Sequence, residues 1–155
     1  FIVRWPGKVA AGVVDEASLI SAVDLLPTFC DAAGVSLPAG YQPDGMSQLA
    51  VLKGQAAPSR AKPLFWKFDS PWPAADDRPD HWVSYAVVDQ TWKLVTNPDF
   101  SYVELYEIGN DPFEENDLKQ QNPEIVRQLL AKLDTWKATL PAQPTGAVFS
   151  AERSQ

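Results

Sequence analysis

Short apolar stretches separated by polar turns occupy the second half of the chain, and this spacing predicts β-strands. The three clearest stretches are residues 83–88, 92–95 and 103–108. The connections at 89–90 and 97–99 are short and polar, so consecutive strands should pair antiparallel as a meander. An apolar run at 64–68 could supply a fourth strand.

A helical period follows these strands. Residues 123–140 carry apolar side chains three and four positions apart, with basic residues on the opposite face. Asn122 is placed to cap this helix, and Pro123 suits its first position, where a missing N–H costs little. The expected apolar stripe is Val126, Leu129, Leu130, Leu133, Trp136 and Leu140. Residues 56–140 therefore predict a small antiparallel four-stranded sheet packed on a long C-terminal helix, followed by a flexible tail at 141–155.

The first third of the chain has a different pattern. The apolar run at residues 1–5 predicts a buried strand, and 19–23 predict a second one. A helix of about three turns is expected over 24–33, with Asp24 at its N-cap and Gly34 as its stop. A further short helix is expected over 47–53. Trp66, Trp92 and Trp136 lie in regular elements and are predicted to be core residues.

Composition narrows the class of protein. The chain has 155 residues and a net charge of −7, which disfavours binding to nucleic acid or to an anionic membrane. No apolar run of about 18 residues indicates a membrane span. One cysteine and one histidine exclude a disulfide framework and a nucleophile–histidine triad with a spare histidine for metal. Because the sequence lacks an initiator Met and a signal peptide, we expect a fragment or a cleaved product, whose compartment stays open.

Ten short motifs follow one another in a characteristic order. They are FIVRWPGK at 1–8, SAVDLLPT at 21–28, AAG at 32–34, DG at 44–45, LKG at 52–54, LFW at 64–66, WKL at 92–94, ELYEI at 104–108, DPFE at 111–114 and NDL at 116–118. Together they resemble the second half of the arylsulfatase-type sulfatase family, over residues 1 to about 140. The tail beyond Pro141 takes no part in the resemblance.

The resemblance implies a fold and a reaction. It predicts an α+β chain in which residues 1–55 are the end of the large α/β domain and a linker, including its last strands and helix. The smaller C-terminal subdomain would be residues 56–140. The family hydrolyses sulfate esters with a formylglycine made from a Cys/Ser-x-Pro-x-Arg motif. It uses a divalent cation, usually calcium, and Lys and His residues that stabilise the developing anion.

The catalytic residues that the family uses do not match positions in this chain. Ser36–Leu37–Pro38–Ala39–Gly40 is the nearest approach to the nucleophile motif, and it lacks the arginine. In the family, the nucleophile, metal ligands and catalytic Lys and His all precede a segment like residues 1–8. We therefore assign no catalytic, cofactor or metal residue here. The chain alone is expected to be catalytically silent, with calcium bound in the full-length enzyme.

Several residues have two readings. Cys30 could be a reactive thiol, but a small apolar residue on the inner face of its helix is favoured. Asp111, Glu114, Glu115 and Asp117 could bind calcium, but their spacing lacks the DxDxDG pattern and favours turn chemistry. In the proline-rich loop at 69–81, Trp72, Arg78 and His81 are candidates for a substrate rim. An ordinary proline-rich surface loop is favoured over this function, because a single sequence assigns no function to a loop by itself.

The sequence thus favours the C-terminal part of a sulfuric ester hydrolase that shapes the substrate rim of the full enzyme. Its partners would be the N-terminal catalytic domain of the same protein and a sulfated small molecule or glycan, with neither nucleic acid nor membrane. The resemblance favours a periplasmic or secreted enzyme. The alternative is a free-standing carbohydrate-binding or structural module.

Overall fold

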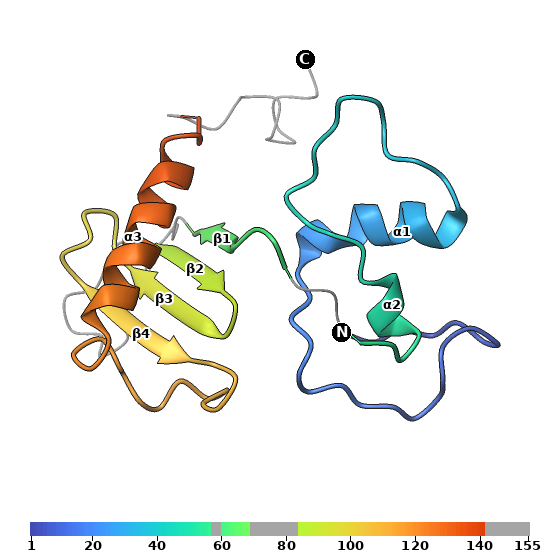
Figure 1. Cartoon of the computed structure of the whole chain (residues 1–155), viewed down its shortest axis with the longest axis horizontal. Helices are drawn as coiled ribbons and strands as arrows, with labels where there is room; N and C mark the ends of the chain where they lie inside the picture. Colours follow the sequence, from blue (N-terminus) through green and yellow to red (C-terminus); the bar gives the residue numbers. More distant parts are fainter. Residues whose placement is uncertain (57–59, 69–83, 142–155) are drawn as a thin grey trace, which may run out of the picture.

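The computed structural model describes residues 1–56, 60–68 and 84–141. In these ranges a short 3₁₀ helix η1 (Ala22–Asp24) leads into α1 (Leu25–Ala33), and α2 (Leu49–Leu52) follows. The strands β1 (Leu64–Lys67), β2 (Tyr85–Asp89), β3 (Trp92–Thr96) and β4 (Val103–Glu107) come next, and α3 (Pro123–Lys137) follows β4. Figure 1 shows the sheet with α3 on one side of the molecule, and α1 with α2 on the other.

The four strands form one antiparallel sheet in the order β1-β2-β3-β4, which confirms the predicted meander and its fourth strand. The register sets Val87 opposite Leu94, and Leu94 opposite Leu105. Because side chains alternate between the two faces of a strand, these three residues share one face. All three are fully buried, so this face is the core side of the sheet.

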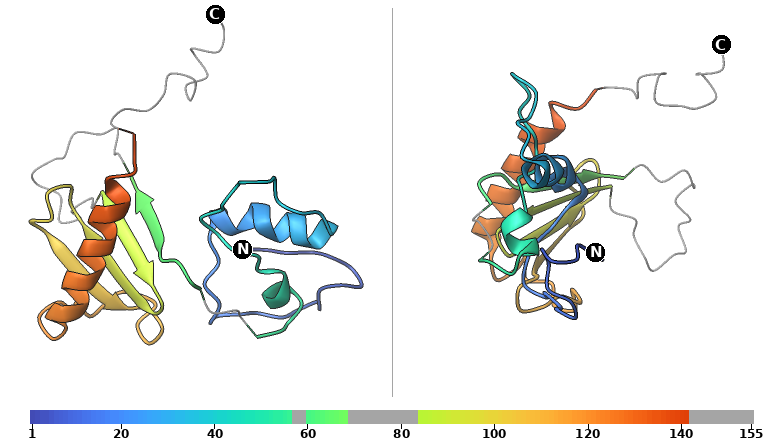
Figure 2. Two further views of the ribbon diagram at one scale, coloured as in Figure 1. Left: turned by 45° about the horizontal axis from the view of Figure 1, so that its top comes forward. Right: turned by 90° about the vertical axis from the view of Figure 1, so that its right-hand side faces the viewer.

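The helix α3 covers the core side of the sheet, as the sequence predicted. Its buried residues Leu129 and Leu133 join the cluster that contains Val87, Leu94 and Leu105. At the edge of this cluster the rings of Phe65 and Trp136 stack, with their centroids 5.1 Å apart. The views in Figure 2 show α3 lying across one face only.

The turn between β2 and β3 requires an unusual backbone conformation. Gln90 has φ of 55°, in the left-handed region that glycine adopts most easily. Two-residue hairpin turns of this kind favour Asn-Gly or Gly-Gly, because their central residues need positive φ. Gln90 therefore carries some backbone strain in an otherwise regular hairpin.

The two strands predicted in the first third of the chain were wrong. Residues 1–5 and 19–21 have no regular structure, and 22–24 form η1. An extended segment becomes a strand only when another strand accepts its hydrogen bonds, and no described segment of this chain lies alongside residues 1–5 as a β-partner. Ile2 is consequently 99% exposed.

The predicted helix at 24–33 is confirmed as α1, and Gly34 ends it with φ of 67°. Asp24 occupies the predicted N-cap position of α1, but its side chain makes no capping hydrogen bond to this helix. The apolar spacing of α1 also does not mark a buried stripe within this chain. Leu26 and Phe29 are exposed, and Cys30 is half-buried.

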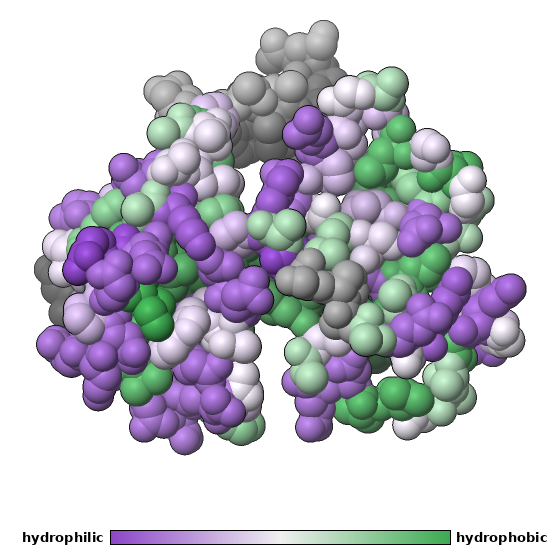
Figure 3. Space-filling model, viewed as in Figure 1, coloured by the Kyte–Doolittle hydropathy of each residue, from purple (hydrophilic) through white to green (hydrophobic). Residues whose placement is uncertain are grey.

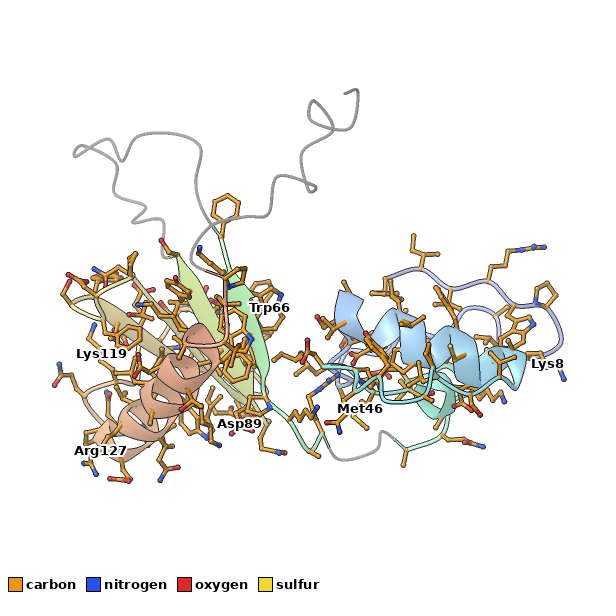
Figure 4. The ribbon with its side chains drawn as sticks, turned by 90° about the horizontal axis from the view of Figure 1, so that it is seen from above. Lys8, Met46, Trp66, Asp89, Lys119 and Arg127 are labelled. Carbon is orange, nitrogen blue, oxygen red and sulfur yellow. The ribbon has the colours of Figure 1, made fainter. Side chains whose placement is uncertain are left out.

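The prediction that Trp66 belongs to the core was wrong. Trp92 and Trp136 pack against the core cluster, but Trp66 is 40% exposed. It alternates with Phe65 along β1 and so projects from the face opposite to α3, as Figure 4 shows.

Candidate functional site

The three predicted rim residues Trp72, Arg78 and His81 lie outside the described residues. Their role stays a prediction. The described residues form three other features. They are a buried ion pair, an exposed apolar surface around α1, and a groove on the face of the sheet that α3 does not cover, which we call the open face.

The carboxylate of Asp24 is the centre of the buried ion pair. Arg60 donates to it through both terminal nitrogens, with Nη1–Oδ1 at 3.0 Å and Nη2–Oδ2 at 2.6 Å. The backbone N–H groups of Ser21 and Met46 donate to the same carboxylate at 2.8 and 2.9 Å. Asp24 is fully buried, and its four acceptor positions are all used.

Burial and hydrogen bonding shift the pKa of Asp24 in opposite directions. Burial raises the pKa of Asp24, but the Arg60 hydrogen bonds and the two backbone donors outweigh it, so the pKa lies below its ordinary value of 3.8. Arg60 also donates from Nη2 to the carbonyl oxygen of Leu19 at 3.1 Å. The linker before β1 is thus fixed to the segment before α1.

A second contact explains why the chain needs the Asp44–Gly45 turn. Gly45 lies directly against the backbone, and a Cβ placed on it would be 2.2 Å from the carbonyl oxygen of Val23. Only glycine permits this approach. It allows Met46 to reach Asp24 and Gln48 N–H to donate to Thr28 Oγ1 at 2.9 Å.

The surface around α1 is unusually apolar. Large hydrophobic side chains are exposed along α1 and in the segments before and after it: Phe1, Ile2, Val3, Val13, Val14, Val23, Leu26, Phe29 and Val35. Figure 3 shows such residues gathered on the half that contains α1, whereas the other half is mostly polar. A hollow of about 240 Å³ lies within this surface, between Phe1–Val3 and the α1 residues Leu25 and Phe29.

The groove lies on the open face of the sheet. It has a volume of about 530 Å³ and is lined by Leu19, Trp66, Ala86, Val88, Lys93, Ile108, Pro112 and Glu114. Most of these side chains are apolar. The two charged ones, Lys93 and Glu114, pair with each other at 2.5 Å across the sheet surface.

The remaining acidic residues near β4 serve local structure. Asp111 accepts hydrogen bonds from the N–H groups of Glu115 and Asn116, which lower its pKa. Burial raises the pKa of Asp117, but Lys119 and the N–H of Leu105 outweigh it and lower the pKa overall. These contacts confirm the predicted turn chemistry. Within the described ranges, no group of three or more His, Cys, Asp and Glu residues could hold a metal ion.

Two tyrosines share one carboxylate on the open face. The hydroxyl of Tyr102 donates to Glu104 at 2.5 Å. Burial raises the pKa of Tyr106, and a hydrogen bond to Glu104 adds to the rise. Both phenols are therefore neutral donors at physiological pH.

No helix in the described part of the chain is both long and apolar enough to cross a membrane.

Sequence reasoning missed Arg60 and the groove for the same reason. Asp24 and Arg60 are 36 residues apart, and no local motif links them. Trp66 is exposed because α3 covers the opposite face of the sheet, and the sequence of β1 does not indicate which face α3 covers. A possible signal was the two-sided apolar character of β2, Tyr85–Ala86–Val87–Val88, which is typical of a strand covered on both faces.

Comparison with known proteins places the chain in a family. The profile of the family described as "N-sulphoglucosamine sulphohydrolase, C-terminal" matches residues 1–139. A curated N-acetylgalactosamine-6-O-sulfatase of Bacteroides thetaiotaomicron is 26% identical over 151 residues, covering 88% of this chain and 27% of that protein. A sulfatase of Formosa agariphila is 28% identical, covering 94% of this chain and 28% of that protein.

Solved structures agree with the sequence comparison. The structure of BT4656 with its substrate D-glucosamine-2-N,6-O-disulfate is 26% identical and has a TM-score of 0.59, covering 88% of this chain and 27% of that one. The fold is also shared with Ps i-CgsB, with a TM-score of 0.64 over 86% of this chain and 27% of that one, at 23% identity. The chain spans just over a quarter of the length of the curated relatives that it matches. It belongs to the family of sulfatase C-terminal domains.

Proposed function

We propose that this chain is the C-terminal portion of an enzyme that hydrolyses sulfate esters of a carbohydrate. The observation that carries the proposal is the family match over residues 1–139, together with the sheet-and-helix fold that this chain shares with sulfatases. The catalytic groups would belong to the part of the enzyme that this chain does not include, which we call the catalytic portion.

Calcium would likewise be bound by the catalytic portion. Three of the four acidic residues considered above for calcium are already engaged in other contacts. Asp111 accepts backbone N–H groups, Glu114 pairs with Lys93, and Asp117 pairs with Lys119. Calcium needs six to eight oxygen ligands that converge on one point.

The substrate class comes from the relatives. One relative is named for N-acetylgalactosamine 6-O-sulfate, and another was solved with a sulfated glucosamine. We extend this to a sulfated sugar for the present enzyme. The predicted rim residues Trp72, Arg78 and His81 would contact the sugar rather than the sulfate. We extend the proposal to a periplasmic or secreted enzyme, as the family resemblance implies.

The exposed surface of α1 supports the proposed division of the chain, in which residues 1–55 complete the large domain. Soluble proteins rarely leave a contiguous apolar patch of this kind uncovered. Phe29 is 62% exposed, and Ile2 is almost fully exposed. The catalytic portion would cover both. A free-standing module would have to keep this surface in water.

Activity of the complete enzyme tests the proposed function. The complete gene product, assayed with calcium on a panel of sulfated monosaccharides and disaccharides, should release sulfate from at least one of them. The present chain alone should release none. A complete protein without activity on any sulfated sugar would contradict the proposal, as would turnover by this chain that is lost in Cys30→Ser or Ser36→Ala.

A pair of substitutions tests the division at residue 55. Leu26→Ser should leave the stability of the present chain nearly unchanged, because Leu26 is already exposed here. In the complete enzyme the same change should cost about 2–4 kcal/mol, the usual loss for a buried leucine. The control is Gln128→Ser on the exposed side of α3, which should have little effect in either protein. Equal, small effects of Leu26→Ser in both proteins would contradict this division.

A further inference from the structure

The linker before β1 joins two parts of the chain that each pack within themselves. In residues 1–56, which we call the α1 half, α1 contacts η1 and α2. In the sheet half, formed by the four strands and α3, the helix contacts β2 and β3. Residues 60–63 lead into β1, and Figure 4 shows the two halves side by side, with Met46 at the end of the α1 half nearest to the sheet. The contacts of this linker can therefore set the orientation of one half relative to the other.

Arg60 in this linker binds both halves. Its guanidinium donates to Asp24 and to the carbonyl oxygen of Leu19, which both belong to the α1 half. Its own carbonyl oxygen accepts a hydrogen bond from Gln90 Nε2 at 3.4 Å, from the turn between β2 and β3. A bidentate arginine–carboxylate pair fixes the plane of the guanidinium as well as its position. Arg60 is therefore a directional bridge between the halves.

The strained conformation of Gln90 fits such a bridge. With φ of 55° its position favours glycine or asparagine, yet the chain places a longer amide there. That amide contacts Arg60, and a side chain one methylene shorter would not reach as far. The neighbouring Asp89 pairs with Lys132 of α3, so the turn is also tied to the helix. Backbone strain of this kind often marks a functional position, because the surrounding structure must maintain it.

The other contacts between the halves are less directional. Leu19 lies with Trp66 and Val88 in the wall of the groove. Apolar contact of this kind favours closeness but has no preferred direction, so it would allow the halves to rotate. Lys62 Nζ donates to the carbonyl oxygen of Pro43 at 3.1 Å, but its long flexible side chain is exposed. The orientation thus depends mainly on the arginine.

We propose that Arg60 and Gln90 form a joint that holds the sheet half in one orientation against the α1 half. The guanidinium fixes the linker to Asp24, and the Gln90 amide fixes the same residue to the sheet half. Without either contact the linker would become a hinge, although each half would keep its own fold. The inference concerns the chain itself and does not rest on the proposed function.

A distance measurement across the two halves tests the joint. In a Cys30→Ser background, Ala33→Cys at the end of α1 and Gln128→Cys on α3 place spin labels at two exposed positions. Double electron–electron resonance on the present chain should give one narrow distance distribution. Arg60→Ala should widen it about twofold or more, because loss of the joint leaves an ensemble of orientations. Arg60→Lys should widen it as well, since an ammonium group cannot replace the planar fork.

A variant of Gln90 separates orientation from stability. Gln90→Asn should relieve the backbone strain and leave the melting temperature unchanged or higher, yet it should widen the distance distribution because the amide no longer reaches Arg60. It also keeps the test decisive if Arg60→Ala does not fold. Lys119→Ala, which breaks a pair with Asp117 inside the sheet half, is the matched control and should leave the width unchanged. A broad distribution in the natural sequence, a narrow one in Gln90→Asn or in folded Arg60→Ala, or equal broadening in the control would overturn the proposal.

Discussion

At the scale of single residues, the ion pair between Asp24 and Arg60 holds the linker before β1 against the segment before α1. The carboxylate is fully buried and accepts four hydrogen bonds, two of them from Arg60. A buried charge with all its partners is tolerated, but the same charge without them is strongly destabilising. The stability of this junction therefore depends on one arginine.

Arg60→Ala should lower the free energy of unfolding by about 3 kcal/mol, because Asp24 would keep only two backbone donors. Urea unfolding at neutral pH measures the change. The control is Lys132→Ala, which breaks the partly exposed pair between Lys132 and Asp89 and should cost less than about 1 kcal/mol. Similar losses in the free energy of unfolding for the two variants would show that the buried pair contributes no more to stability than the partly exposed pair.

The lowered pKa of Asp24 predicts a pH dependence. A carboxyl whose folded pKa lies below its unfolded value contributes fully above the unfolded value of about 3.9, and the contribution disappears as pH falls through the folded pKa. The stability difference between the natural chain and Asp24→Asn should thus be constant from pH 7 to about pH 5 and shrink below about pH 4. Urea titrations at several pH values measure this difference. A difference that grows on acidification would contradict the assignment.

Gly45 is the second residue on which the junction depends. A methyl group there would overlap the carbonyl oxygen of Val23, so Gly45→Ala should cost about 2–3 kcal/mol and detach Met46 from Asp24. Gly12→Ala is the matched control, since it has open space and only the strain of a left-handed residue, about 1 kcal/mol. Thermal unfolding of both variants measures the contrast. Equal melting temperatures would mean that the turn moves freely away from Val23.

At the scale of elements, the sheet and α3 were predictable because their signals are local. Strand period, turn residues and the apolar stripe of α3 all lie within a few positions of each other. The strands expected at residues 1–5 and 19–23 failed because a strand also needs a partner, which sequence period does not supply. The Asp24–Arg60 ion pair and the exposure of Trp66 depend on packing between segments that are distant in the sequence. No local sequence pattern could therefore predict them. Trp72, Arg78 and His81 remain predictions.

The packing of α3 on the sheet gives an element-scale prediction. Trp136→Ala removes the ring that stacks on Phe65 and should cost about 3 kcal/mol, the lower end for a large aromatic because Trp136 is half-buried. Urea unfolding followed by far-UV circular dichroism measures it. Trp136→Phe keeps a stacked ring and should recover most of the loss. An unchanged midpoint for Trp136→Ala would show that α3 does not stabilise the sheet.

At the scale of the whole molecule, the two halves differ in what they can do alone. The sheet and α3 enclose their own core, whereas the half around α1 exposes most of its large apolar residues. Figure 3 shows this contrast directly. Such a surface is the expected character of a region that completes a larger domain.

The predicted rim gives a prediction for the complete enzyme. A contact between Arg78 and the sugar would be similar in the ground state and the transition state, so Arg78→Ala should raise KM more than it lowers kcat. The expected loss in kcat/KM is about tenfold on a bulky anionic substrate and small on a minimal aryl sulfate. Steady-state kinetics on both substrates, with His81→Ala in parallel, would decide. A collapse of kcat on the minimal substrate would place Arg78 in the catalytic centre instead.

The distance along the chain between Asp24 and Arg60 has a consequence for synthesis on the ribosome. Arg60 is made 36 residues after its partner. At translation rates of about 5–20 residues per second, Asp24 waits roughly 2–7 s before its arginine has been added. During that interval the carboxylate of Asp24 lacks its arginine, and the junction before α1 cannot reach its final packing. A released chain that ends before residue 60 should therefore leave this segment open to proteases, whereas a chain that continues past residue 60 should protect it.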